Sequence, residues 1–304
     1  MACYHPITAY RSRTVNPSGK RGIVFDKLKS FVDLDPLQIP CGQCIGCRLE
    51  RSRQWAIRCV HEASLYQQNC FLTLTYDNAH LPHVINKETG ELIPSLNKRD
   101  IVLFLKRLRK SYPEVKIRFF QCGEYGELLQ RPHHHVLLFN FDFPDKKFFK
   151  SVNRQPLYVS KSLQRLWPHG LSSIGSLTYE SAAYVARYIT KKINGDAASD
   201  HYAGRLPEFI TMSRRGGIGR QWFDQFANDV FPHDYIVLNN KKMKPPKYYE
   251  KLYEMQDFDK LFRIKSIRKA KAKMSTDNTP ERLLVREKVQ IARFQKLPRI
   301  LEKI

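Results

Sequence analysis

Long apolar runs and acidic residues are both scarce in this sequence. No stretch approaches the roughly 18 consecutive apolar residues of a membrane-spanning helix, and the start, "MACYHPITAYRSRTV", lacks the charged-then-apolar layout of a signal peptide. Only 29 Asp and Glu stand against 52 Lys and Arg, which gives a formal net charge of +23. We therefore expect a soluble cytoplasmic protein that binds a polyanion, with nucleic acid ahead of an anionic membrane.

The seven cysteines do not suggest a disulfide framework, because their number is odd and no export signal is evident. Three of them form "CGQCIGC", where two-residue gaps can bring Cys41, Cys44 and Cys47 round one metal ion. Cys3 or His5 could complete four ligands of a structural Zn²⁺ site if the N-terminus folds back. The alternative is three reduced thiols in a turn, which the glycines of this segment would serve equally well.

Nearly half of the net charge lies in the last fifth of the chain. Residues 241–304 contain 19 basic and 8 acidic residues. This region begins with "NNKKMKPPKYYEK", which is typical of a linker because prolines and lysines interrupt any periodicity. Segments 261–273 and 281–297 have helical spacing with basic faces. We predict one folded region over 1–240 and a basic linker with a helical tail over 241–304, either solvated, loosely docked or bound to nucleic acid.

The first 240 residues alternate between helical and strand patterns, without an internal repeat. In chain order the segments are 47–67 (helix), 70–76 (strand), 98–112 (helix), 115–127 and 131–140 (strands). Ser95 or Asn97 can cap the second helix, which ends before Pro113. This order predicts an α+β fold, with a central antiparallel β-sheet of five or a similar number of strands and flanking helices on one face.

The segment "RPHHHVLLFN" places three histidines at the start of a buried strand. Alternate side chains of a strand share a face, so His133 and His135 point one way and His134 points the other. Two neutral imidazoles on one face can bind one divalent metal ion. Glu124 could add a carboxylate across the turn, with Glu127 as the less suitable substitute, and such a mixed site with open positions suits Mn²⁺ or Mg²⁺. The alternative is a polar strand end with solvated histidines.

The segment "SLTYESAAYVARYITKKING" (176–195) predicts an amphipathic helix. Its apolar stripe consists of small or branched residues, namely Ala182, Val185, Ala186 and Ile189. Tyr184, Tyr188 and Lys191 fall on the opposite side. The two tyrosines are either ordinary packing residues or, one helical turn apart, hydroxyls that can both reach one phosphate beside the Lys191 charge. Tyrosine titrates near about pH 10, so it would need a metal-polarised phosphate in order to attack.

Five motifs occur in a fixed order along residues 41–240, namely "PCGQCIGCR", "FLTLTYDNAHLP", "GEYGELLQRPHHHVLLF", "YVARYITKK" and "SRRGGIG" followed by "WF". This set resembles the replication initiators of the HUH endonuclease superfamily, most closely those of the gokushovirus-type microviruses. The resemblance implies a ferredoxin-like palm, with His133 and His135 as metal ligands and Tyr184 and Tyr188 as two nucleophiles followed by Lys191. Gly216 is a departure, because proline is expected there in the family pattern.

The resemblance also implies an activity. It predicts a metal-dependent enzyme that nicks and rejoins single-stranded DNA at a phage origin through a phosphotyrosine, and so drives rolling-circle replication of a small circular genome in the cytoplasm of a bacterial host. Host helicase and polymerase are the further partners implied. Arg131, Arg187 and Lys192 are the expected DNA contacts. Two alternatives stay open, a non-catalytic nucleic-acid-binding or packaging protein and a transposase-like nuclease with the same chemistry.

Overall fold

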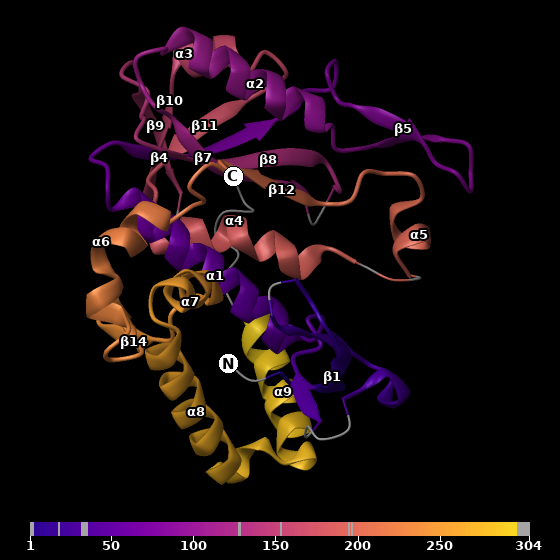
Figure 1. Ribbon diagram of the computed structural model, residues 1–304. Coiled ribbons are helices and arrows are strands. Elements are labelled where there is room, and N and C mark those ends of the chain that lie inside the picture. The colour runs from indigo at the N-terminus through magenta and orange to yellow at the C-terminus, as the bar shows by residue number, and fades with distance from the viewer. Residues whose placement is uncertain are drawn as a thin grey trace. The chain divides into compact units, whose positions relative to one another are not determined.

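The structure is a computed structural model that describes residues 3–17, 19–31, 36–126, 129–152, 154–193, 195 and 197–296, without the side chains of 188–191 and 197 (Figure 1). Contacts divide the chain into two compact units. We call Met1–Glu50 with Arg268–Leu297 the terminal unit, and Arg51–Ile267 the sheet unit. Within the described residues, no helix has both the length and the apolar character needed to cross a membrane.

An antiparallel sheet forms the centre of the sheet unit. Its strands are β4 (Asn69–Thr75), β7 (Arg118–Tyr125), β8 (Pro132–Phe139), β9 (Lys147–Val152), β10 (Gln155–Val159), β11 (Ser172–Gly175) and β12 (Phe209–Met212). They lie in the order β12-β7-β8-β4-β11-β10-β9, so the sheet has seven strands where the sequence predicted about five. The α+β fold with a central antiparallel sheet is confirmed.

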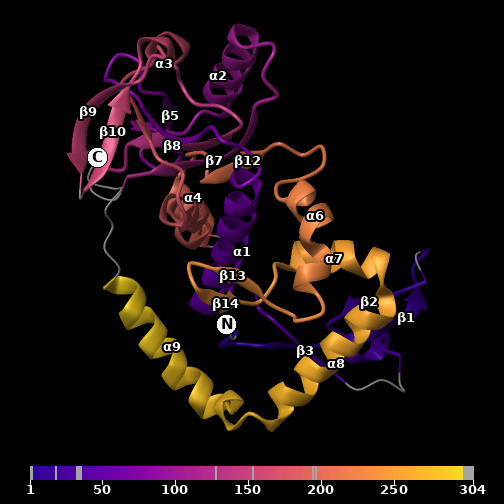
Figure 2. The same cartoon turned by 90° about the vertical axis from the view of Figure 1, so that its left-hand side faces the viewer.

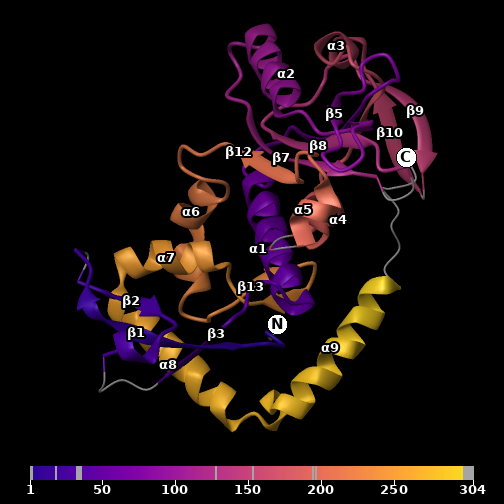
Figure 3. The same cartoon turned by 90° about the vertical axis from the view of Figure 1, so that its right-hand side faces the viewer.

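Helices cover both faces of this sheet, not one face as predicted (Figure 1). These helices are α1 (Ile45–Ala63), α2 (Lys98–Ser111), α3 (Lys161–Leu166) and α4 (Tyr179–Lys191). α2 and α3 pack on the face that carries Leu72 and Val136, whereas α1 and α4 pack on the face that carries Phe71 and Leu137. Strands β4 and β8 are apolar on both faces, so each face needs its own cover. Figures 2 and 3 show α2 and α4 on opposite sides of the sheet.

Side-chain caps fix the start of two of these helices. Asn97, one of the two caps considered from the sequence, accepts a hydrogen bond from the backbone N–H of Arg99, and α2 ends at Ser111 as Pro113 requires. At the start of α4, Thr178 and Ser181 cap each other reciprocally, with N···O distances of 2.8 and 3.2 Å. These local signals place α4 in register beneath the sheet.

A buried ion pair holds the "SRRGGIG" loop. Glu62 and Arg118 are paired in the interior, and the Arg118 guanidinium also donates to the carbonyls of Arg215, at 2.8 Å, and Gly217, at 2.6 Å. Gly216 has a φ of 79°, which the proline ring cannot adopt because it holds φ near about −65°. The glycine in place of the expected proline therefore follows from the shape of this loop.

A further apolar cluster of the sheet unit involves α6 (Arg220–Val230) and α7 (Lys247–Gln256). Tyr249 is fully buried there, and its hydroxyl lies 3.0 Å from Nδ1 of His61, whose ring stacks on Trp222. Residues 239–251, which the sequence predicted to be a linker, thus include β14 (Lys241–Met243) and the start of α7. The domain boundary at residue 240 stays a prediction.

The terminal unit contains a small sheet in the order β2-β1-β3 and the helix α9. The helices predicted at 261–273 and 281–297 correspond to α8 and α9. The elements not yet given are β1 (Ile7–Val15), β2 (Arg21–Val24), η1 (Lys27–Lys29), β3 (Leu37–Ile39), β5 (His83–Ile85), β6 (Leu92–Pro94), α5 (Ala197–Tyr202), β13 (Ile236–Leu238), α8 (Phe258–Met274), η2 (Thr276–Asn278) and α9 (Pro280–Gln295).

Candidate active site

The hairpin of β7 and β8 brings a carboxylate and two imidazoles together. Glu124 is the direct antiparallel partner of His133, and His135 lies two residues further along β8 on the same face. That face packs against α4, because Phe71 and Leu137 on it share a cluster with residues of α4. The predicted strand alternation is therefore present in the structure.

The three side chains converge on one point. Oε1 of Glu124 lies 3.1 Å from Nε2 of His133 and 3.3 Å from Nε2 of His135. One ligand atom from each residue lies within 4.8 Å of the other two, which is close enough for all three to contact one ion. Glu127, the alternative carboxylate, lies outside the described residues.

The outer ring nitrogens of both histidines have partners that suit a metal ligand. Nδ1 of His133 lies 3.1 Å from the carbonyl oxygen of Arg131. A carbonyl only accepts, so Nδ1 carries the proton in this contact and Nε2 keeps its lone pair toward Glu124. Nδ1 of His135 lies 3.1 Å from the Thr73 hydroxyl. Such outer hydrogen bonds orient metal-binding imidazoles, so the residues fit a divalent cation.

Glu124 is an ionised carboxylate in a buried position, with 1% of its surface exposed. Burial raises the pKa of this group, but hydrogen bonds from His133 and His135 and their charges outweigh it and hold the pKa well below its usual range. A carboxylate and two imidazoles form a mixed donor set that suits Mn²⁺ or Mg²⁺. The three residues are therefore a candidate site for either ion.

His134 points to the opposite face, as the alternation predicted. Its ring is fully buried near Trp167 and Phe209, and Nε2 lies 3.1 Å from the Tyr76 hydroxyl. The Tyr76 hydroxyl in turn donates to Asp100. Burial, followed by the neighbouring histidines, lowers the pKa of His134 to about 3, so the ring is neutral. This imidazole is part of the core between the sheet and α2.

Tyr184 reaches the three-residue group from α4. Its hydroxyl donates a 3.0 Å hydrogen bond to Oε1 of Glu124, the oxygen that faces both histidines. Its ring meets His135 edge to face, with centroids 5.0 Å apart, and only 5% of the residue is exposed. Tyr184 is therefore packed as well as polar, although the sequence assigned packing only to the small apolar stripe of the helix.

The other predicted site residues lie at varying distances from this centre. Tyr188 and Lys191 belong to α4, but their side chains lie outside the described residues. The Arg187 guanidinium carbon is 5.6 Å from the Tyr184 ring centroid, and Lys192 follows the end of α4 half-buried. Arg131 donates to Asn78 and to the Tyr76 carbonyl, and its own carbonyl faces His133. These contacts leave their DNA-binding roles as predictions.

The cysteine cluster gathers far along the chain from the hairpin. The Sγ atoms of Cys3, Cys41, Cys44 and Cys47 all lie within 4.8 Å of one another, so Cys3 joins the three cysteines of "CGQCIGC". His5, the other predicted fourth ligand, instead pairs with Glu287 at 2.6 Å.

Sequence reasoning missed the residues that orient the histidines. Thr73 holds His135, and Tyr76 with Asp100 holds His134. The alternation of threonine with apolar residues over 70–76 did indicate a strand with a polar face. It could not indicate the partner, because only the pairing of β4 with β8 places Thr73 opposite His135.

Comparison with known proteins adds an independent line of evidence. The profile of a family described as "Replication-associated protein ORF2" matches residues 69–193, which include the hairpin and α4. The chain is 34% identical to replication-associated protein VP4 of Bdellovibrio phage phiMH2K over 90% of this chain and 84% of that protein. It is 32% identical to replication-associated protein ORF2 of Spiroplasma virus 4, over 86% and 83% of the two chains.

A third relative is replication-associated protein ORF4 of Chlamydia phage 1, which is 30% identical over 70% of this chain and 53% of that protein. No solved structure matches the chain. The first two relatives are matched over most of their length, and the matched family region contains the carboxylate, both histidines and the tyrosine helix. The chain therefore belongs to the family of phage replication-associated proteins, the microvirus-type replication initiators that its ordered motifs resemble.

Proposed function

We propose that the protein is a nicking and strand-joining enzyme of the HUH type, which initiates rolling-circle replication through a phosphotyrosine intermediate. One observation carries the proposal, namely that the Tyr184 hydroxyl is bonded at 3.0 Å to the Glu124 oxygen that both histidines face. A nucleophile must lie beside the groups that activate its target, because only then are the reacting atoms held in a near-attack geometry. This contact meets that requirement before DNA binds.

Glu124, His133 and His135 would hold a Mn²⁺ or Mg²⁺ ion, which when bound supplies Lewis-acid polarisation of the scissile phosphate. The Tyr184 oxygen then attacks phosphorus, and its proton leaves along the hydrogen bond that now points at Glu124. One P–O bond to tyrosine forms as the P–O3′ bond breaks, and the 3′ oxygen takes up a proton. Rejoining is the reverse attack by a 3′ hydroxyl, so the cycle needs no further energy source.

Tyr188 is the proposed second nucleophile, because it lies one turn along α4 from Tyr184. Lys191, a further turn along the same helix, is proposed to balance the charge of the phosphate. Arg131, Arg187 and Lys192 are the proposed contacts to the DNA backbone. The net charge of +23 supports strong attraction to DNA that weakens with salt.

The names of the relatives support a phage origin as the DNA substrate and the interior of a bacterial host as the place of action. Host helicase and polymerase would then extend the free 3′ end that nicking leaves. The same names favour replication over the transposase-like alternative. A packaging or other purely DNA-binding role would explain the charge, but it assigns no purpose to the bond between Tyr184 and Glu124.

The experiment that tests this proposal uses single-stranded oligonucleotides that tile the phage genome encoding the chain. Each is labelled at its 3′ end, because that fragment keeps the 5′ phosphate to which tyrosine would attach. With Mn²⁺ we expect one oligonucleotide to give a labelled band at protein mass on a denaturing gel, and EDTA to remove it. A packaging protein would retard the oligonucleotides on a native gel without any covalent band.

A further inference from the structure

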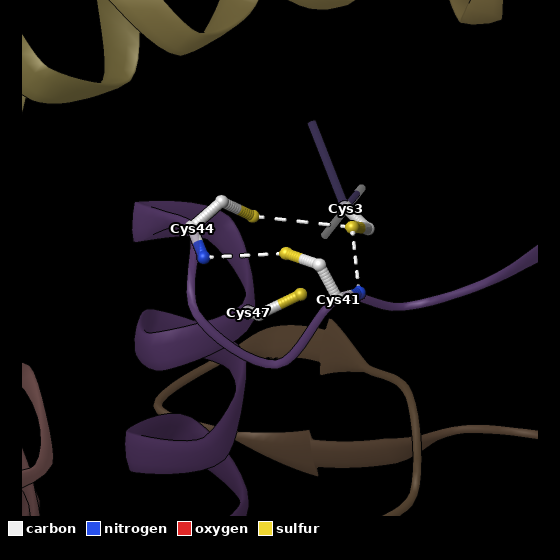
Figure 4. Close-up of side chains that lie close together, drawn as sticks. All are labelled: Cys3, Cys41, Cys44 and Cys47. Atoms are coloured by element: carbon white, nitrogen blue, oxygen red, sulfur yellow. Dashed lines mark hydrogen bonds between the residues drawn. The ribbon is translucent and has the colours of Figure 1, made fainter. Parts of the chain in front are cut away.

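Four cysteines from two distant parts of the chain meet in the terminal unit. Cys41 and Cys44 flank a short turn, Cys47 lies in the first turn of α1, and Cys3 comes from the N-terminal segment (Figure 4). All four thiols are free, and their sulfur atoms lie within 4.8 Å of one another. The sulfur atoms of Cys44 and Cys3 are 4.0 Å apart. Tetrahedral Zn²⁺ with Zn–S bonds of about 2.3 Å separates its sulfurs by a similar distance, roughly 3.8 Å.

The backbone around the cluster is arranged to stabilise negative charge on sulfur. The N–H of Cys41 donates to Sγ of Cys3 at 3.2 Å, and the N–H of Cys44 donates to Sγ of Cys41 at 3.3 Å. The N–H of Tyr4 donates to Sγ of Cys44 at 3.4 Å. In addition, Cys44 and Cys47 lie at the N-terminus of a 19-residue helix, where the helix dipole favours anions. These donors suit thiolates, the form in which cysteine binds metal.

We propose that Cys3, Cys41, Cys44 and Cys47 bind one structural Zn²⁺ ion, which fastens the N-terminal segment to the start of α1. Four Zn–S bonds form and each thiol gives up its proton to solvent. With four protein ligands the site is closed and has no position for a substrate, so its role is to hold the fold. The proposal is independent of the nicking activity, because none of these residues belongs to the hairpin or to α4.

The ion would also fix the position of α9 within the terminal unit. Tyr4, next to Cys3, packs with Cys44 and with Leu283 of α9, and His5 bonds Glu287 on the same helix. The apolar part of this contact is small, so burial alone gives it little stability. Coordination of Cys3 would hold Tyr4 and His5 where they meet α9. Zinc thereby links the two ends of the chain that make up this unit.

Metal content of the purified full-length protein is the direct test. We expect about one zinc per chain. In Cys3→Ala the zinc content should fall about tenfold or more, because three thiolates hold the ion less tightly. His5→Ala and Cys70→Ala are the matched controls, and both should retain zinc, since His5 pairs with Glu287 and Cys70 is buried in β4. Loss of zinc in His5→Ala but not in Cys3→Ala would overturn the ligand set.

Two measurements on the unaltered protein cover the case that a variant fails to fold. Reconstitution with Co²⁺ should give the intense visible bands of tetrahedral tetrathiolate cobalt, and a mercurial reagent should release zinc as it titrates the four thiols. Iron in place of zinc, a disulfide, or no metal at all would contradict the proposal. Zinc removal should also expose the terminal unit to limited proteolysis while residues 51–267 persist as a fragment, and unchanged proteolysis would overturn the structural role.

Discussion

Alanine at His133 or at His135 is expected to reduce Mn²⁺-dependent nicking by about 10³-fold or more. Each imidazole presents Nε2 to Glu124, and each is oriented through Nδ1, at Arg131 or at Thr73. Losing a ligand removes metal-dependent charge stabilisation of several kcal/mol, which corresponds to this factor. Nicking rates on a 3′-labelled origin oligonucleotide, measured over a range of Mn²⁺ concentrations, check the prediction.

His134→Ala is the matched control, and its effect should be of a different kind. The His134 ring fills a buried space and bonds the Tyr76 hydroxyl, so its removal should lower the free energy of unfolding by about 2 to 4 kcal/mol. At a temperature where the variant is folded, its Mn²⁺ dependence should match that of the parent. Equal losses of nicking at all three positions, with equal stability, would show that the proposed division between the two faces is wrong.

The double variant Tyr184→Phe/Tyr188→Phe is expected to form no covalent adduct, whereas each single variant still forms some. After one attack the first phenol is locked in a phosphotyrosine, so a second nucleophile is needed to cut the regenerated origin. A tyrosine one turn away on α4 can supply it. Phenylalanine keeps the ring, and the lost bond from Tyr184 to Glu124 costs only about 1 kcal/mol of stability.

Repeated cleavage and rejoining should suffer more than the first nick in both single variants. Successive rounds on a circular single-stranded substrate separate these two quantities. Tyr179→Phe, at the start of the same helix, is the control and should behave like the parent. If one single variant is inert and the other completes repeated rounds like the parent, the scheme of alternating tyrosines has to be abandoned.

The core of the candidate site could be predicted from the sequence because its signals are local. His133 and His135 share a face by strand alternation, Glu124 meets His133 across a single hairpin, and helical spacing isolates Tyr184 from the apolar stripe. The bond from Tyr184 to Glu124 joins residues 60 positions apart, and local patterns identify its two ends without indicating that they meet.

Features that depend on distant pairings could not be predicted. Thr73 meets His135 only because β4 lies beside β8, and nothing near Thr73 in the chain indicates that order. The choice of Cys3 over His5 depends on a contact of His5 with α9. Residues 239–251 have the local composition of a linker, yet Tyr249 is buried by His61 and Trp222 from other helices. Local composition therefore does not reveal burial that distant aromatic residues provide.

The central claim is that a tyrosine of α4 becomes covalently joined to DNA, and peptide mapping of the adduct tests it most directly. The protein is trapped on its origin oligonucleotide in Mn²⁺, the DNA and protein are digested, and the peptide that carries the nucleotide is sequenced by mass spectrometry. The account predicts phosphotyrosine at Tyr184 or Tyr188, with the phosphate from the 5′ end of the cleaved strand. An adduct on any other residue, or cleavage without an adduct, would contradict it.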